Sequence, residues 1–382
     1  MAIILIEGFE MGKPASNLST ENFWGISTGA GLSIQSTVVR TGNYALGVNG
    51  SGSGYLYSYV VPATGETGTA ATPPIWARFY FRYDSISGQT GIARMFVSAG
   101  GHNVMLLNTD GTLQLSCSGT GFTSAASATA LEVGQWYCLE WKFFLADSAA
   151  YELRIDGVVE ITGTADTKVA AGDTSVLALD LGVVSGGSLT AYFDDLAIDN
   201  ADYPGPGRII RRVPTGNGNY TGWVAGTGSG DFNEWDEVPH DTDTTTVTTS
   251  TNTTKESGTS SNVMPHSASI TAVMACALVK DAAQTCNWSV GIRSGSTDSF
   301  STAADNGSTG YYQRRKINTT DPSTSAAWTR AGVVAAEVAV NHAQGQSRAL
   351  TLTAMSLMVQ YVDWIKPLAT NVNQSRNRAA NF

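Results

Sequence analysis

The sequence predicts an all-β protein made of two β-sandwiches in series. Apolar and polar residues alternate in steps of two from Tyr137 to Phe143 and again over residues 151–155, as in strands that bury one face. The chain has 41 glycines and only 14% charged residues, which is typical of short strands joined by many turns. Its 382 residues are enough for two domains, each with its own core.

The apolar run at residues 2–6 predicts the first strand. No basic region precedes this run and no small-residue cleavage site follows it, so we interpret it as a strand and not as a signal peptide. No apolar run approaches the roughly 20 residues that a membrane-spanning helix needs. We therefore expect no membrane insertion.

A hairpin and a closing strand follow the alternating run at residues 137–143. Asp156 and Gly157 accept the positive φ angles of a type I′ turn, so they predict a tight hairpin after residues 151–155. Residues 192–199 read as a later strand with charge at its centre.

These three elements, in this order, resemble the concanavalin A-like (laminin G-like) jelly roll over residues 1–203. They are a tryptophan strand, a hairpin of the form Leu-x-Ile-Asp-Gly, and an aromatic-Asp-Asp-Leu-x-Ile strand. The resemblance implies that residues 6–10 belong to a first strand that pairs beside the last one. It does not specify a function, because this fold is shared by lectins, glycanases, adhesins and virion proteins.

The first domain is expected to end at residues 204–207, where two prolines and two glycines interrupt any regular strand. A second sandwich is expected over residues 208–365. Its strand patterns lie at residues 269–280, 287–293, 310–317, 327–340 and 349–361. Residues 333–340 could also form a helix, but Gly332 and the valines favour a strand. The last pattern is apolar on both faces, which predicts a strand covered on both sides.

A threonine-rich segment, residues 241–260, has almost no apolar residue except Val247. It predicts a long surface loop, or an extended arm laid over another subunit. The four cysteines include no Cys-x-x-Cys unit, so we expect buried free thiols in a protein made in a reducing cytoplasm.

The second half resembles a module of tailed-bacteriophage virion proteins. The similar stretches are residues 211–220, Trp223, residues 236–247 and the Asp-Pro-x-Thr-x-x-x-Trp-Thr loop at residues 321–329. This resemblance implies a structural role in a virion.

The polar, basic tail at residues 366–382 has no acidic residue, and Arg376, Arg378 and Phe382 are candidates for docking on an acidic neighbour. The alternative is a frayed terminus.

Catalytic patterns are missing from the sequence. No Glu-x-Asp-x-Glu run of the glycanase type occurs, and the four histidines lie beside no nucleophile elbow and are interpreted as surface loop residues. The excess of 32 acidic over 22 basic residues opposes binding to nucleic acid. We therefore expect no catalytic residues and no enzyme.

Two sets of side chains are candidate binding sites. Tyr55, Tyr57 and Tyr59 share one strand face and could stack on a glycan, although such a stripe is more often half-buried or at a subunit contact. Asp194, Asp195 and Asp199 are candidate ligands for Ca²⁺. Adjacent residues of a strand point to opposite sides, which instead favours one solvated and one turn-capping carboxylate. No other cofactor is expected.

The predicted function is that of a non-enzymatic virion structural protein, exposed as a head decoration or fibre protein. Its expected partners are other capsid or tail proteins and copies of itself, a trimer being one candidate. The alternative is a tail adhesin that binds host glycans through the first sandwich.

Overall fold

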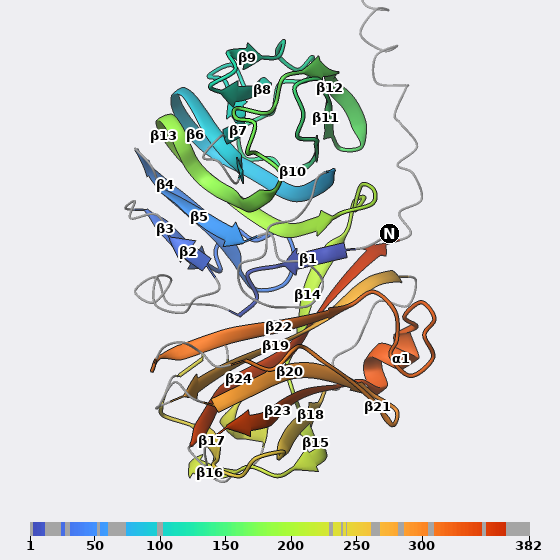
Figure 1. Cartoon of the computed structure of the whole chain (residues 1–382). Coiled ribbons are helices and arrows are strands. Elements are labelled where there is room, and N and C mark those ends of the chain that lie inside the picture. Colours follow the sequence, from blue (N-terminus) through green and yellow to red (C-terminus); the bar gives the residue numbers. More distant parts are fainter. Residues whose placement is uncertain are drawn as a thin grey trace, which may run out of the picture.

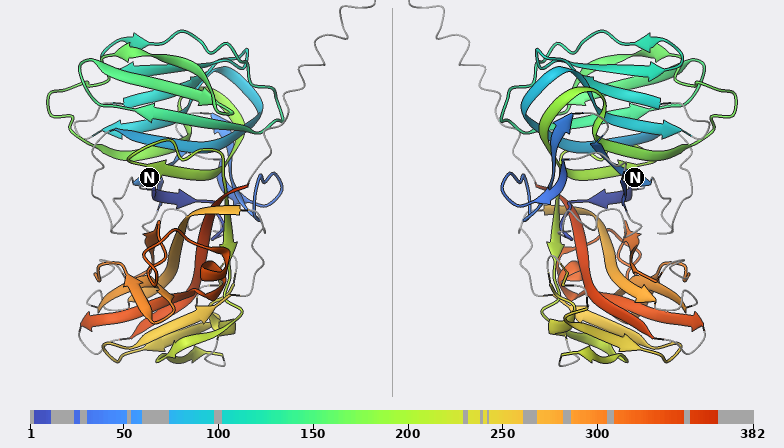
Figure 2. Two further views of the ribbon diagram at one scale, coloured as in Figure 1. Left: turned by 90° about the vertical axis from the view of Figure 1, so that its right-hand side faces the viewer. Right: turned by 90° about the vertical axis from the view of Figure 1, so that its left-hand side faces the viewer.

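The computed structural model describes thirteen stretches of the chain, and almost all of their regular elements are strands (Figure 1). The prediction of an all-β fold with two sandwiches in series is confirmed (Figure 2). No helix in these stretches is long and apolar enough to cross a membrane. The described residues are 3–11, 24–26, 31–51, 54–59, 74–97, 102–228, 232–237, 240–241, 243–260, 268–281, 286–304, 309–345 and 349–363.

The first sandwich is a concanavalin A-like jelly roll built from one 13-stranded sheet that folds over on itself. Its central order is β12-β11-β10-β6-β13-β4-β3. The strands are β1 (Ile3–Glu7), β2 (Trp24–Ile26), β3 (Leu32–Gln35), β4 (Ala45–Ser51), β5 (Gly54–Tyr59), β6 (Ile75–Val97), β7 (His102–Leu107), β8 (Leu113–Ser118), β9 (Phe122–Thr123), β10 (Tyr137–Phe143), β11 (Ala149–Ile155), β12 (Val158–Ala165) and β13 (Val176–Asp199).

Strands β6 and β13 pair along their length and run through both layers. The first part of β6 pairs with β10 and its last part with β7. Glycines allow the pair to bend between the layers. Gly186 has φ +84°, and a Cβ on Gly187 would lie 1.7 Å from the Ser87 carbonyl oxygen. Side chains cannot be accommodated there, so the bend depends on glycine.

The predicted hairpin and first strand are both confirmed. Asp156 and Gly157 have φ angles of 51° and 82° between β11 and β12, as a type I′ turn requires. The Asp156 carboxylate also accepts a hydrogen bond from the Cys138 backbone N–H at 2.8 Å. At the amino terminus, β1 pairs antiparallel with the end of β13.

The second sandwich consists of a 6-stranded and a 5-stranded sheet. The first has the order β16-β17-β24-β19-β22, with β14 also paired to β24, and the second has the order β15-β18-β23-β20-β21. Their elements are β14 (Arg208–Arg212), β15 (Gly216–Thr221), β16 (Val224–Thr227), the short 3-10 helix η2 (Phe232–Glu234), β17 (Thr246–Thr249), β18 (Lys255–Thr259), β19 (Ala268–Asp281), β20 (Cys286–Ser294), β21 (Thr297–Phe300), β22 (Tyr311–Asn318), α1 (Arg330–Ala335), β23 (Glu337–Gly345) and β24 (Leu350–Asp363).

The threonine-rich segment is not a long surface loop, so that prediction is wrong. It supplies β17 to one sheet and β18 to the other, and thereby links the two layers. Val247 is buried in the core, and the threonine hydroxyls are bonded within the fold, as in the contact between Thr249 and Thr254 at 3.1 Å. Threonine is β-branched and fits a half-buried strand even where apolar residues are few.

Residues 327–340 are partly helical, which corrects the prediction of a continuous strand. The Thr329 hydroxyl accepts a hydrogen bond from the Gly332 backbone N–H at 3.0 Å and caps α1. This capping interaction starts one short helical turn despite the glycine. Strand β23 begins only at Glu337.

Strand β24 is buried on both faces, as predicted. Leu352 and Leu357 lie in the core of the second sandwich, whereas Ala354 and Met358 lie in a separate apolar cluster that contacts the first sandwich. A register shift at Thr353 exchanges the two faces, which simple alternation did not predict. The four cysteines are free and buried, also as predicted.

Candidate functional site

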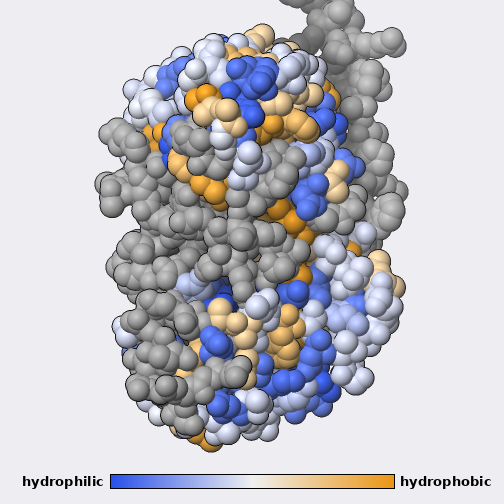
Figure 3. Space-filling view, in the orientation of Figure 1, coloured by the Kyte–Doolittle hydropathy of each residue, from blue (hydrophilic) through white to orange (hydrophobic). Residues whose placement is uncertain are grey.

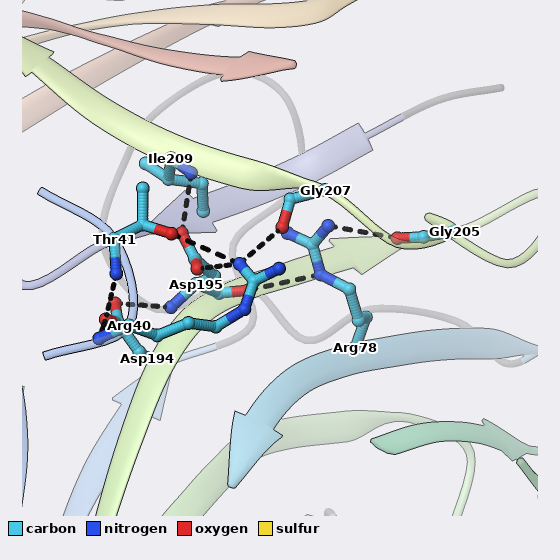
Figure 4. Close-up of polar contacts among 8 residues, drawn as sticks. All are labelled: Arg40, Thr41, Arg78, Asp194, Asp195, Gly205, Gly207 and Ile209. Atoms are coloured by element: carbon cyan, nitrogen blue, oxygen red, sulfur yellow. Dashed lines mark hydrogen bonds and ion pairs between the residues drawn. The ribbon is translucent and has the colours of Figure 1, made fainter. Parts of the chain in front are cut away.

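A group of buried and half-buried charged side chains lies where the two sandwiches meet. We call it the junction network and define it by the residues of Figure 4: Arg40, Thr41, Arg78, Asp194, Asp195, Gly205, Gly207 and Ile209. Beside it lies the junction cluster, the apolar group formed by Ile3, Ile6, Met11, Ala197, Ile209, Ala272, Met274, Cys276, Leu278, Tyr311, Ile317, Ala354 and Met358. Both sandwiches contribute to this cluster.

Asp195 is the central residue of the junction network. A bulge in β13 gives it a φ angle of 50° and turns its carboxylate toward the second sandwich. That carboxylate forms an ion pair with Arg40 and accepts the backbone N–H of Ile209 in β14 at 2.6 Å. Asp195 therefore binds one group from each sandwich.

Two arginines attach the linker to the first sandwich. Arg40 donates to the Gly207 carbonyl oxygen at 2.9 Å. Arg78, which is fully buried in β6, donates to the carbonyl oxygens of Asp195 at 3.1 Å and Gly205 at 3.0 Å. Hydrogen bonds from these two arginines therefore hold the linker, residues 200–207, against the sheet of the first sandwich (Figure 4).

Asp194 is buried next to Asp195 but faces a different set of donors. It accepts backbone N–H groups from Arg40 at 2.9 Å, Thr41 at 3.1 Å and Asp195 at 2.7 Å. Burial, and then the neighbouring Asp195 charge, raise the pKa of the Asp194 carboxyl. The expectation that one of the two aspartates is solvated is wrong, because the bulge buries both.

The predicted calcium ligands Asp194, Asp195 and Asp199 have other partners in the structure. Asp199 accepts the backbone N–H groups of Ala201 at 2.6 Å and Asp202 at 3.1 Å, and so caps the turn that begins the linker. The described stretches contain no cluster of three or more His, Cys, Asp or Glu side chains arranged to hold a metal ion. These carboxylates instead bind arginine and backbone N–H groups.

Glu10 is another buried carboxylate near the junction. It accepts the backbone N–H groups of Asn43 at 2.9 Å and Tyr44 at 3.1 Å. Arg211 of β14 donates to the Glu10 carbonyl oxygen at 3.2 Å. Burial raises the pKa of Glu10 to about 7 and lowers the pKa of Arg211 to about 10.

A half-buried group of aromatic and charged side chains lies on the outer face of the first sandwich, beside the linker. The rings of Trp76 and Tyr203 are 6.4 Å apart, and the Arg154 guanidinium lies 3.7 Å from the centre of the Tyr203 ring. The Tyr203 hydroxyl donates to Glu152 at 2.9 Å. Glu140 accepts the Gly205 backbone N–H at 3.0 Å, and burial raises the pKa of Glu140.

Neither these residues nor the arginines of the junction network were predicted from the sequence. The available signal was the alternation in β6, where Trp76, Arg78 and Tyr80 fall on the face opposite the core residues Ala77 and Phe79. The histidine prediction also needs correction. His342 is fully buried, with its ring near the Thr251 carbonyl oxygen at 3.1 Å, and His240 is buried as well.

The other predicted site residues are three tyrosines of the first sandwich and three residues of the carboxy-terminal tail. Tyr55, Tyr57 and Tyr59 are in β5, in register with Gly182, Asp180 and Ala178 of β13, and their side chains are outside the described residues. Arg376, Arg378 and Phe382 also lie outside the described residues. The glycan and tail predictions stay predictions.

Comparisons with known proteins give similarity of fold only. No protein-family model and no curated protein matches the chain. Among solved structures, the cellulose-induced protein Cip1 is 18% identical, with a TM-score of 0.40 over 53% of this chain and 99% of its own. The alginate lyase Aly36B is 12% identical, with a TM-score of 0.40 over 52% and 97%. An endo-β-1,4-glucuronan lyase from the fungus Trichoderma reesei is 14% identical, with a TM-score of 0.36 over 47% and 92%.

Two of these three proteins, the alginate lyase and the glucuronan lyase, are enzymes. The expectation that the chain is not an enzyme is therefore corrected, since the absence of a familiar motif gave no ground for excluding catalysis on such a fold. The similarity itself assigns no activity to this chain.

Proposed function

We propose that the chain is a structural protein exposed on the surface of a tailed-bacteriophage virion, as a head decoration or fibre component. The observation that carries this proposal is the junction, in which buried ion pairs, linker hydrogen bonds and an apolar cluster attach two sandwiches to each other. A protein that acts through its shape and its subunit contacts needs such fixed geometry.

Two further features support the proposal. The loops of the second half resemble a virion module at residues 211–220, 236–247 and 321–329. The described surface in Figure 3 mixes hydrophilic and apolar residues over both sandwiches, as in proteins that meet solvent over most of their surface.

Protein mass spectrometry of particles purified on a density gradient tests this proposal. We expect the chain to band with the particles, in a constant ratio to the major capsid protein across the fractions. A chain that is found only in the unsedimented lysate, and not in intact particles, would contradict the proposal.

Glycan binding by the first sandwich is a second candidate function. The observation that favours it is the half-buried pair Trp76 and Tyr203 with Arg154 beside it, because aromatic faces and charged groups together can bind a sugar ring and its substituents. A glycan array with the full chain tests this function. Binding that is lost in Trp76→Ala or Tyr57→Ala, but kept in the surface control Val224→Ala, supports it. Analysis of the bound glycans for shortened products tests for turnover in the same experiment.

A further inference from the structure

Strand β12 ends the sheet of the first sandwich, and its outer edge carries no partner strand among the described residues (Figure 1). It pairs with β11 on one side from Val158 to Ala165. A free strand edge presents a row of backbone N–H and C=O groups that can pair with another chain.

The other 8-residue strand at a sheet edge in the described structure carries three basic residues, whereas β12 carries none. Strand β22 ends the 6-stranded sheet and carries Arg314, Arg315 and Lys316 in succession. Charged side chains on an edge strand are a common barrier to edge-to-edge association. Strand β12 contains no basic residue and no proline.

The single charge of β12 is already used within its own chain. The Glu160 carboxylate accepts the Thr129 backbone N–H at 2.9 Å and the Thr129 hydroxyl at 2.7 Å. The register between β11 and β12 shifts at Glu160, which marks a bulge there. After the bulge, residues 161–165 form an uncharged, regular edge.

Apolar side chains flank this edge on the side of the hairpin turn. Val158 is 60% exposed and Val159 is 46% exposed. Because successive side chains of a strand point to opposite faces, the two valines add apolar surface on both faces of the sheet near its edge.

We propose that β12 pairs antiparallel with β12 of a second copy of this chain, across a two-fold axis near Gly163, so that two first sandwiches share one continuous sheet. An identical edge suits this pairing because a two-fold contact brings the same segment of each copy together. The five residues nearest the axis, 161–165, carry no charge, so two chains of net charge −10 meet there without like charges directly opposite each other. The pairing is a property of the purified chain and does not depend on its presence in a virion.

Paired charge variants at two exposed positions of this edge test the proposal. Thr162 and Thr164 are exposed, so substitution leaves the core intact. Sedimentation velocity of the wild-type chain should give twice the 40.1 kDa mass of one chain. The double variants Thr162→Lys/Thr164→Lys and Thr162→Glu/Thr164→Glu should each be monomers, because like charges face each other across the axis. An equal mixture of the two variants should recover the dimer.

The matched control places two lysines on β16, which ends the 6-stranded sheet, as Val224→Lys/Ala225→Lys. This control should remain dimeric, and unchanged melting temperatures should show that all variants are folded. A wild-type chain that stays monomeric, a closed trimer, or a dimer that persists in both β12 variants would each overturn the proposal.

Discussion

Asp195 joins groups that are far apart in the sequence. Its carboxylate binds Arg40, 155 positions away, and the Ile209 backbone N–H. Sequence reasoning identified Asp194 and Asp195 as notable but assigned them to calcium, because a local pattern does not reveal an arginine contributed by a distant loop. The bulge that buries both side chains is equally invisible to a strict two-residue period.

Replacing Asp195 with Asn should destabilise the protein by about 3 kcal/mol, because it leaves the Arg40 charge without its partner in a buried site. Urea unfolding at pH 7 measures this loss. The matched control is Asp84→Asn, which breaks the more exposed ion pair with Arg82 and should change stability by less than about 1 kcal/mol. Equal losses in the two variants would contradict the role assigned to Asp195.

Glu10 should make the protein less stable as the pH rises. Its pKa is raised from the ordinary value of 4.5 to about 7, so the native state holds more protons than the unfolded state between these two values. Stability therefore decreases from pH 5 to pH 8, with at most about 3 kcal/mol due to Glu10.

Urea unfolding of the wild type and of Glu10→Gln across this pH range measures the contribution of Glu10. The variant should lose less stability than the wild type on going from pH 5 to pH 8. Some dependence should persist in it, because burial also raises the pKa of Glu256 to about 7. Parallel profiles for the two proteins would show that Glu10 does not titrate in this range.

At the scale of elements, turns were predicted better than strand boundaries. The Asp156–Gly157 turn was predictable because its backbone angles allow few residue types. The threonine-rich strands β17 and β18 were not predicted, because a segment with almost no apolar residue gives no sign that it contacts a core. Only part of a strand needs to be apolar, and here Val247 and buried threonines such as Thr246 are sufficient.

Gly157→Ala should destabilise the first sandwich by about 1 kcal/mol. A Cβ at this position meets no atom within 4 Å, so the loss comes only from the backbone, which has a φ angle of 82°. Thermal unfolding measures the change. Gly157→Asn is the matched control and should lose less, because asparagine tolerates this conformation. If alanine and asparagine gave the same stability, the turn would not be limited by backbone strain.

At the scale of the whole molecule, the junction should make the two sandwiches unfold together. The all-β class and the two sandwiches were predictable from alternation and length, but the junction was not, because its cluster combines residues from Ile3 to Met358. Strand β24 gave a partial signal through its two apolar faces. Only the structure shows that the second face of β24 is covered by the junction cluster.

Met11→Asp should uncouple the two sandwiches. Met11 is buried in the junction cluster, and its sulfur lies 3.2 Å from the Ser356 hydroxyl of β24, so a carboxylate there would be placed in an apolar site. Scanning calorimetry should show one transition for the wild type and two for Met11→Asp. Val158→Asp, at an exposed position, should keep one transition. Two transitions in the wild type would mean that the junction does not couple the sandwiches.

Immunogold electron microscopy of intact phage particles tests the central claim, exposure on a virion, most directly. The antibody should recognise the exposed turn around Val133, which lies outside both the junction network and β12. We expect gold label on the outer surface of untreated particles at a fixed position on the head or tail. Unlabelled intact particles, with the chain detected only in free form in the lysate, would contradict the claim.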